Sequence, residues 1–173
     1  MVKNKRIKKL AELTKGYNTL LDIGSDHGYV IKEALLKGYV KQAIATDINK
    51  EPLLRANKNL EKFNVKTIQS DGFLNIAEDF DVCIIAGMGA YLISDILKHA
   101  PKTSNHYILQ ANDKEEILRE FLMNNNFIIT DEHLVFDKFF YVIIEAKKGD
   151  MELSKVDLLL GPILKTKKES KKY

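Results

Sequence analysis

The sequence predicts an α/β protein: a Rossmann-like, seven-stranded, mostly parallel sheet with helices on both faces and one antiparallel edge strand. Short apolar runs alternate with helical periods along most of the chain, and this alternation is typical of parallel strands joined by right-handed crossovers. Two strand-like segments without proline, 127–137 and 138–148, then follow each other with no room for a helix. That closing pair predicts the antiparallel strand.

The expected elements can be placed one by one. Ile7, Leu10 and Ala11 share one face of an opening helix. Asn49 suits the N-cap of a later helix, and Asp113 is a candidate cap for the last one. The predicted strands cover 18–24, 43–48, 65–69, 81–87, 106–112, 127–137 and 138–148, and the predicted helices cover 7–14, 28–38, 49–63, 90–100 and 113–125.

Composition restricts the class of protein. With 173 residues, 45% of them apolar, the chain can build one core, and we expect that domain over 1–162 and a basic tail over 163–173. There is no run of about 18 apolar residues and no apolar leader, so we expect a cytoplasmic protein without a membrane segment. The one cysteine, Cys83, lies among apolar residues and predicts a buried thiol.

The segment LLDIGSDHGYV, residues 20–30, joins the first strand to a helix, and open α/β sheets bind ligands at such a place. Gly24 and Gly28 permit positive φ, and the helix N-terminus offers N–H groups to a carboxylate. Asp26 would repel a pyrophosphate but attract an ammonium group. The loop therefore favours the methionine part of S-adenosylmethionine over a dinucleotide, with an ordinary strand-to-helix turn as the alternative.

Two more acids follow the next two strands. Asp47, beside Ile48, can accept hydrogen bonds from both ribose hydroxyls. Asp71, between Ser70 and Gly72, is placed to meet an adenine amino group. Three acids after three successive strands favour a nucleoside ligand over chance helix caps. Asp47 and Asp71 do not separate S-adenosylmethionine from NAD; the Asp26 loop and the closing strand pair favour S-adenosylmethionine.

At this point the sequence resembles the bacterial tRNA adenine-N1 methyltransferases that act on position 22 of tRNA. The similarity runs from about Leu10 to Pro162 and is carried by LLDIGSDHGY, ATDIN, QSDGF, IIAGMG, ILQAN and NNFIITDEHLVFDKFFYVIIEAKKG. The resemblance implies the class I methyltransferase fold, S-adenosyl-L-methionine as cofactor and tRNA as partner. Such proteins continue into a helical arm, so we interpret 163–173 as the start of an arm that is missing or truncated.

The resemblance also implies roles for the residues. Neutral adenine N1 attacks the methyl group, and Asp26, with His27 beside it, stabilises the cationic product. Tyr29 and Met88 either stack on the flipped base or belong to the core, and Gln110 and Asn112 either bind the base edge or cap a loop. The expected cofactor contacts are Asp22, Gly24, Ser25, Asp26, Gly28, Asp47, Ile48, Ser70, Asp71, Gly72, Ala86 and Gly87. The expected substrate contacts are Tyr29, Met88, Gly89, Gln110, Asn112, Lys5, Arg6 and Lys9.

Positive charge is concentrated at the two ends. The first 15 residues carry six bases and one acid, and the last 13 carry five bases and one acid. Such ends can contact tRNA phosphates, or they are solvated surface that reflects an AT-rich genome. His99, His106 and His133 share no metal-ligand spacing, so we treat them as structural or surface residues and expect no metal. We expect a monomer in preference to an oligomer.

Three other functions stay open at this stage. A methyltransferase acting on another RNA or on a small molecule would need the same cofactor site. An NAD-dependent oxidoreductase would use the same sheet but does not fit the Asp26 loop. A non-catalytic RNA-binding module would keep the basic ends but would not need acids at three strand ends.

Overall fold

The computed structural model of the chain describes residues 4–103 and 105–168. Seven strands form one sheet in the order β3-β2-β1-β4-β5-β7-β6. The chain divides into two units, Met1–Ile85 and Ala86–Tyr173, and each is described separately below. In the described residues, no helix is long and apolar enough to cross a membrane.

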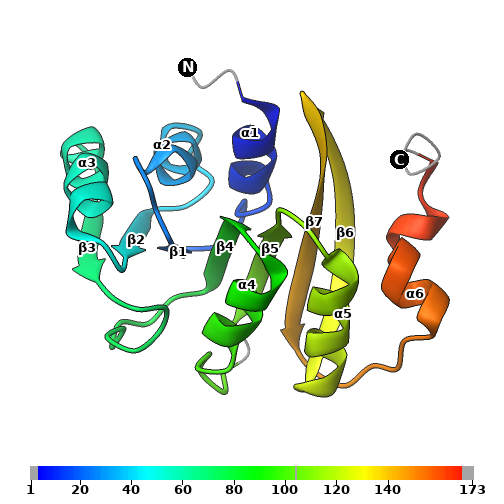
Figure 1. The fold of residues 1–173 in the computed structure, drawn as a ribbon. Helices are drawn as coiled ribbons and strands as arrows, with labels where there is room; N and C mark the ends of the chain where they lie inside the picture. Colours follow the sequence, from blue (N-terminus) through cyan, green and yellow to red (C-terminus); the bar gives the residue numbers. More distant parts are fainter. Residues whose placement is uncertain (1–3, 104, 169–173) are drawn as a thin grey trace. The chain divides into compact units, whose positions relative to one another are not determined.

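The first unit alternates helices and strands, as the sequence predicts. Its strands β1, β2 and β3 pair in parallel, and the first four residues of β4 add to β1 in the same direction. All five residues of β1 are buried, which is typical of a parallel strand covered on both faces. The elements are α1 (Lys5–Glu12), β1 (Thr19–Ile23), α2 (Tyr29–Leu36), β2 (Gln42–Asp47), α3 (Lys50–Leu60), β3 (Val65–Gln69) and β4 (Val82–Met88), which continues into the second unit (Figure 1).

The second unit contains the antiparallel strand. β7 pairs antiparallel with both β5 and β6. In Figure 1, α4 and α5 lie together on one side of these strands, and α6 lies beyond β6. The elements are α4 (Ala90–Leu97), β5 (His106–Ala111), α5 (Glu115–Asn124), β6 (Phe127–Asp137), β7 (Phe139–Lys148), α6 (Lys155–Leu160) and the short 3-10 helix η1 (Leu164–Thr166).

The α/β fold with one antiparallel strand is confirmed, but the position of that strand differs from the prediction. β6 takes the edge, and β7 lies one place further in, between β5 and β6. The reason is the way the chain connects β5, β6 and β7. β6 follows helix α5 and leaves one strand position open beside β5. The tight turn at Lys138, which has φ 66°, then places β7 in that position, because a short hairpin can join only antiparallel neighbours.

One local prediction at a helix end needs correction, and one short helix was not predicted. Asp113 does not cap α5, because the N-cap position is Lys114, which has φ 54° and whose side chain makes no capping hydrogen bond. Instead, Glu115 and Glu116 in the first turn complement the positive end of the helix. The sequence analysis also missed α6, although Ser154 and Asp157 form a capping box that gives a readable signal.

A buried ion pair, the Arg119–Glu132 clasp, joins α5 and β6 to the C-terminal segment. Arg119 Nε lies 2.9 Å from Glu132 Oε1, and the two side chains are 2% and 0% exposed. Glu132 Oε2 accepts the backbone N–H groups of Ile163 at 2.9 Å and Leu164 at 2.8 Å. Arg119 Nη1 donates to the Leu158 carbonyl at 2.8 Å. The clasp thus satisfies both buried charges with hydrogen bonds.

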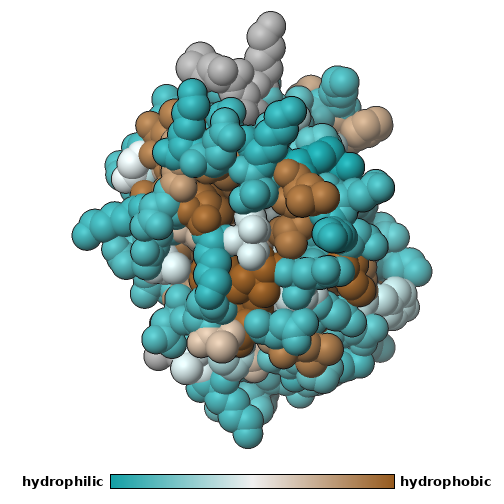
Figure 2. All heavy atoms as spheres, turned by 90° about the vertical axis from the view of Figure 1, so that its left-hand side faces the viewer, coloured by the Kyte–Doolittle hydropathy of each residue, from teal (hydrophilic) through white to brown (hydrophobic). Residues whose placement is uncertain are grey.

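The basic tail expected over 163–173 lies partly inside the described range. Leu164 is buried, and Lys165 and Lys167 pair with Asp157 and Asp131. Residues 169–173 lie outside the described residues, so the tail boundary stays a prediction. Figure 2 shows the side on which α3 and β3 lie in Figure 1, where apolar side chains form separate small patches among hydrophilic ones.

Candidate active site

The loop between β1 and α2 is fixed by its backbone. The N–H groups of Gly24 and Ser25 donate to the Thr46 carbonyl on β2 at 2.9 and 2.8 Å. Gly24 and Gly28 have φ of 79° and 67°, as predicted from their place in the loop. At Gly28 a Cβ would come within 2.6 Å of Leu60 on α3, so glycine there serves helix packing as well as the turn.

Asp22 lies at the base of this loop and is 6% exposed. Burial raises the pKa of its carboxyl to about 6, and the nearby charge of Asp47 adds to the rise. The Ser25 hydroxyl lies close enough to lower that pKa in part, but its geometry falls short of a hydrogen bond. Ser25 Oγ is therefore a buried polar atom that meets no partner in the described part of the chain.

Asp26 is exposed and ion-paired. Arg55 on α3 lies 3.1 Å from Asp26 Oδ1, and His27 Nε2 lies 3.6 Å from the same oxygen. His27 has φ 61°, and its carbonyl accepts a hydrogen bond from Asn59 Nδ2 at 3.0 Å. The sequence analysis missed Arg55, because 29 residues separate it from Asp26 and nothing in the local pattern indicates the pairing.

Tyr29 starts α2 and stacks on His27, with ring centroids 5.3 Å apart and an interplanar angle of 9°. Tyr29 is 44% exposed, so the core alternative for this residue is wrong. The two rings form a flat aromatic surface next to the Asp26 loop.

The ends of β2 and β3 carry the other two acids. Asp47 is 9% exposed, and its Oδ1 accepts the Asn49 N–H at 2.8 Å. Ile48 follows it with 56% of its surface exposed. After β3, Asp71 is exposed while Ser70 is buried, and Ser70 Oγ donates to the Gly72 carbonyl at 2.8 Å. Asp47 therefore has a buried carboxylate of which Oδ1 accepts a hydrogen bond from Asn49, and Asp71 has a carboxylate in solvent.

In the second unit, the ends of β4 and β5 are joined by a backbone hydrogen bond from Asn112 to the Met88 carbonyl at 2.8 Å. Ala86, Met88 and Gly89 are half-buried and Gly87 is exposed, with φ 79°. Gln110 is fully buried, and its Nε2 donates to the Ala111 carbonyl at 2.6 Å and to Asn112 Oδ1 at 3.2 Å. These bonds fit the loop-cap alternative for Gln110, while Asn112 is exposed.

The basic residues of α1 lie on its outer side. Lys5 is exposed, and Arg6 and Lys9 are half-buried. Lys9 forms a 3.6 Å ion pair with Glu12, one turn along the helix. Asn4 caps the helix by accepting the Ile7 N–H at 3.0 Å.

Comparison with known proteins identifies the family. The sequence profile of the tRNA (adenine(22)-N(1))-methyltransferases matches residues 20–172. The chain belongs to this family. It is 31% identical to the tRNA (adenine(22)-N(1))-methyltransferase of Bacillus subtilis over 182 residues, covering 96% of this chain and 76% of that protein. The resemblance found in the sequence is thereby confirmed.

Two solved structures of similar proteins contain the cofactor or its product. The structure of Sp1610 from Streptococcus pneumoniae, in complex with S-adenosyl-L-methionine, has a TM-score of 0.87 at 31% identity and covers 95% of this chain and 83% of that one. The Mycoplasma capricolum TrmK structure, in complex with S-adenosyl-homocysteine, has a TM-score of 0.79 at 31% identity, covering 89% and 73%. This family membership favours a methyltransferase over an oxidoreductase or a non-catalytic RNA-binding module.

The first unit fits the chemistry of the cofactor that this family uses. Ser25 Oγ offers a buried hydroxyl that lacks a partner in the described residues. The Asp47 carboxylate accepts one hydrogen bond through Oδ1 and has further acceptor capacity, which suits a ribose diol. The exposed side chain of Ile48 beside it suits the face of an adenine ring. Asp26 offers a charge for an ammonium group.

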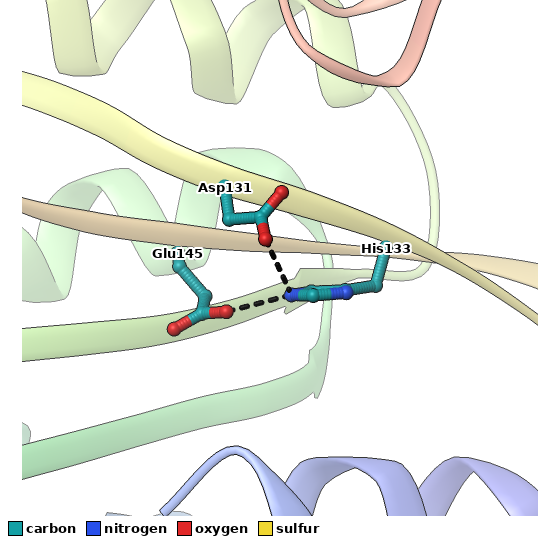
Figure 3. Close-up of side chains that lie close together, drawn as sticks. All are labelled: Asp131, His133 and Glu145. Carbon is teal, nitrogen blue, oxygen red and sulfur yellow. Dashed lines mark hydrogen bonds and ion pairs between the residues drawn. The ribbon is translucent and has the colours of Figure 1, made fainter. Parts of the chain in front are cut away.

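One exposed and one part-buried histidine fit the expectation of surface and structural residues, and the part-buried one also lies beside two carboxylates. His99 is exposed, as a surface residue should be. His133 lies with Asp131 and Glu145 in a group whose ligand atoms are all within 4.8 Å of one another (Figure 3). Spacing along the chain could not reveal this group, because Glu145 joins it across the β6–β7 ladder, where it pairs with Asp131.

Proposed function

We propose that this protein transfers a methyl group from S-adenosyl-L-methionine to N1 of the adenine at position 22 of tRNA. The observation that carries the proposal is the arrangement in the first unit, with Asp22 and Asp47 buried at the ends of β1 and β2 below the Asp26 loop, in a chain of this family. When bound, the cofactor supplies a methyl carbon whose bond to sulfur breaks as the adenine N1 lone pair attacks it, and sulfur keeps the bonding electrons.

The residues of the first unit then orient the cofactor and stabilise the positive charges at the site. Asp47 accepts the ribose hydroxyls, and Asp71 meets the adenine amino group of the cofactor. Arg55 holds the Asp26 carboxylate in place at 3.1 Å and shares its charge, so Asp26 acts on the ammonium group and on the positive charge that develops on the base. No strong base is required, because neutral N1 carries no proton.

A base in folded tRNA has to leave its stack before it can react. The stacked rings of His27 and Tyr29 offer a flat, exposed surface for such a base. In the second unit, Asn112 offers an exposed amide, and Gly87 leaves the end of β4 free of a side chain. Lys5, Arg6 and Lys9 on α1 supply charge for tRNA phosphates.

A labelling experiment tests the proposed reaction. Purified protein is incubated with methyl-labelled S-adenosyl-L-methionine and an unmodified tRNA transcript that carries either A22 or G22. We expect label only in the A22 transcript, as N1-methyladenine, together with a reverse-transcription stop next to position 22. Equal labelling of both transcripts contradicts the position, and no labelling of either by protein that binds the cofactor contradicts the reaction.

Asp47→Ala tests the ribose contact. Loss of hydrogen bonds to a charged acceptor should weaken cofactor binding by about 1.5–3 kcal/mol, or roughly 10- to 150-fold in Kd, measured by calorimetry. Asp79→Ala is the matched control, since Asp79 is an exposed acid in the loop before β4, and it should leave Kd unchanged. Equal Kd values for wild type and Asp47→Ala would rule out the ribose role.

A further inference from the structure

The group formed by Asp131, His133 and Glu145 lies on one face of the β6–β7 ladder (Figure 3). Asp131 pairs directly with Glu145 across the ladder, and His133 is two residues further along β6. Side chains two residues apart on a strand point to the same face. The register of the two strands therefore brings three possible ligands together without any help from a loop.

One oxygen of each carboxylate in this group approaches the same ring nitrogen of His133. His133 Nε2 lies 2.6 Å from Glu145 Oε1 and 3.6 Å from Asp131 Oδ2, and Figure 3 shows both carboxylates directed at the same ring nitrogen. A zinc ion bonds such atoms at about 2.0–2.2 Å, which places two ligands of a tetrahedron roughly 3.3 Å apart. The 2.6 Å separation is shorter than this ligand-to-ligand distance and the 3.6 Å separation is longer. Small side-chain rotations would bring both to the distance that a bound ion requires.

The outer oxygens of both carboxylates are held by other groups. His106 Nε2 lies 2.6 Å from Glu145 Oε2, and Lys167 Nζ lies 2.5 Å from Asp131 Oδ1. Each carboxylate is thus held through one oxygen, while its other oxygen faces His133 Nε2. Metal ligands in proteins are characteristically oriented by hydrogen bonds of this kind.

Accessibility also suits a cation. The side chains of Glu145 and His133 are 14% and 15% exposed and that of Asp131 is 39% exposed. Asp131 therefore forms the open side through which an ion and its water can enter.

We propose that Asp131, His133 and Glu145 bind one divalent transition-metal ion, with His106 as a positioning residue for Glu145. One imidazole nitrogen and two carboxylate oxygens, with water in the fourth place, form a ligand set that suits Zn²⁺. Because the ligands come from both β6 and β7, the bound ion cross-links these two strands. None of these ligands is among the residues assigned to methyl transfer.

Binding is measured on the full chain, without an affinity tag and after treatment with a chelator, by calorimetric titration with Zn²⁺ and by the visible absorption of added Co²⁺. We expect one equivalent of Zn²⁺ to bind, Co²⁺ to give the intense bands of a four-coordinate site, and Zn²⁺ to displace it. His133→Gln and Glu145→Gln should each weaken binding at least 100-fold, and His106→Gln about 10- to 100-fold.

His99→Gln is the matched control, because His99 is an exposed histidine outside the group, and it should bind Zn²⁺ like wild type. Circular dichroism of each variant shows whether it is folded, and the two substitutions on different strands guard against one that fails to fold. No Zn²⁺ binding by wild type, or wild-type affinity in both folded variants, overturns the proposal and leaves the group as a hydrogen-bonded cluster only.

Discussion

Glu132→Ala should lower the free energy of unfolding by about 3–5 kcal/mol, the range for removing one partner of a buried ion pair. The substitution leaves the Arg119 guanidinium, which is 2% exposed, without its carboxylate. It also takes the acceptor away from the N–H groups of Ile163 and Leu164. Urea unfolding followed by circular dichroism measures the change.

Two further variants separate the causes. Asp95→Ala removes a carboxylate that is 66% exposed and paired with Lys98, and it should cost less than about 1 kcal/mol. The double variant Arg119→Met with Glu132→Leu removes both charges and should be more stable than Glu132→Ala, although the two N–H groups still lack their acceptor. A double variant no more stable than the single one would show that the lone guanidinium is not the main cost.

Asp22→Asn should make the protein more stable at neutral pH by about 3 kcal/mol. The pKa of Asp22 rises from its ordinary 3.8 to about 6 on folding, and each pKa unit corresponds to about 1.36 kcal/mol. Between these two values the folded state binds more protons than the unfolded state, so this contribution falls as pH rises from about 4 to about 6 and is constant above. Asparagine cannot ionise and avoids that loss.

The test is the difference in unfolding free energy between variant and wild type, measured at several pH values from 4 to 7 without cofactor. Titrating groups that do not interact with Asp22 contribute equally to both proteins, so the difference should grow with pH over this window. Asp79→Asn, at an exposed position, should show no such growth. A difference between Asp22→Asn and wild type that is independent of pH would contradict the raised pKa.

The order of elements could be predicted from the sequence because most strands of the first unit are short apolar runs, and segments with a helical period separate them. Asp22, Asp47 and Asp71 could be placed at strand ends for the same reason. Arg55 could not be assigned to Asp26, because its partner is set by the packing of α3. The position of β7 depends on which gap in the sheet is open, and a strand pattern carries no such information.

Residue pairs across the β6–β7 ladder could not be predicted from the sequence either. Asp131 and Glu145 are opposite each other only because of the register of the two strands, which also contains an irregularity between Ile129 and Asp131. Glu132 reads as one more polar residue in a strand, yet it is 0% exposed. Its burial depends on the return of 163–164 to the strand, a contact that local propensity does not specify.

Cys83, the single cysteine of the chain, is 0% exposed on β4. Burial, and then the charge of Asp22, raise the pKa of its thiol well above the ordinary value, so very little reactive thiolate forms near neutral pH. The native chain therefore resists maleimide reagents while it stays folded. A cysteine introduced at an exposed position, such as 79 or 139, can then be coupled to a fluorophore or spin label selectively, without first replacing Cys83.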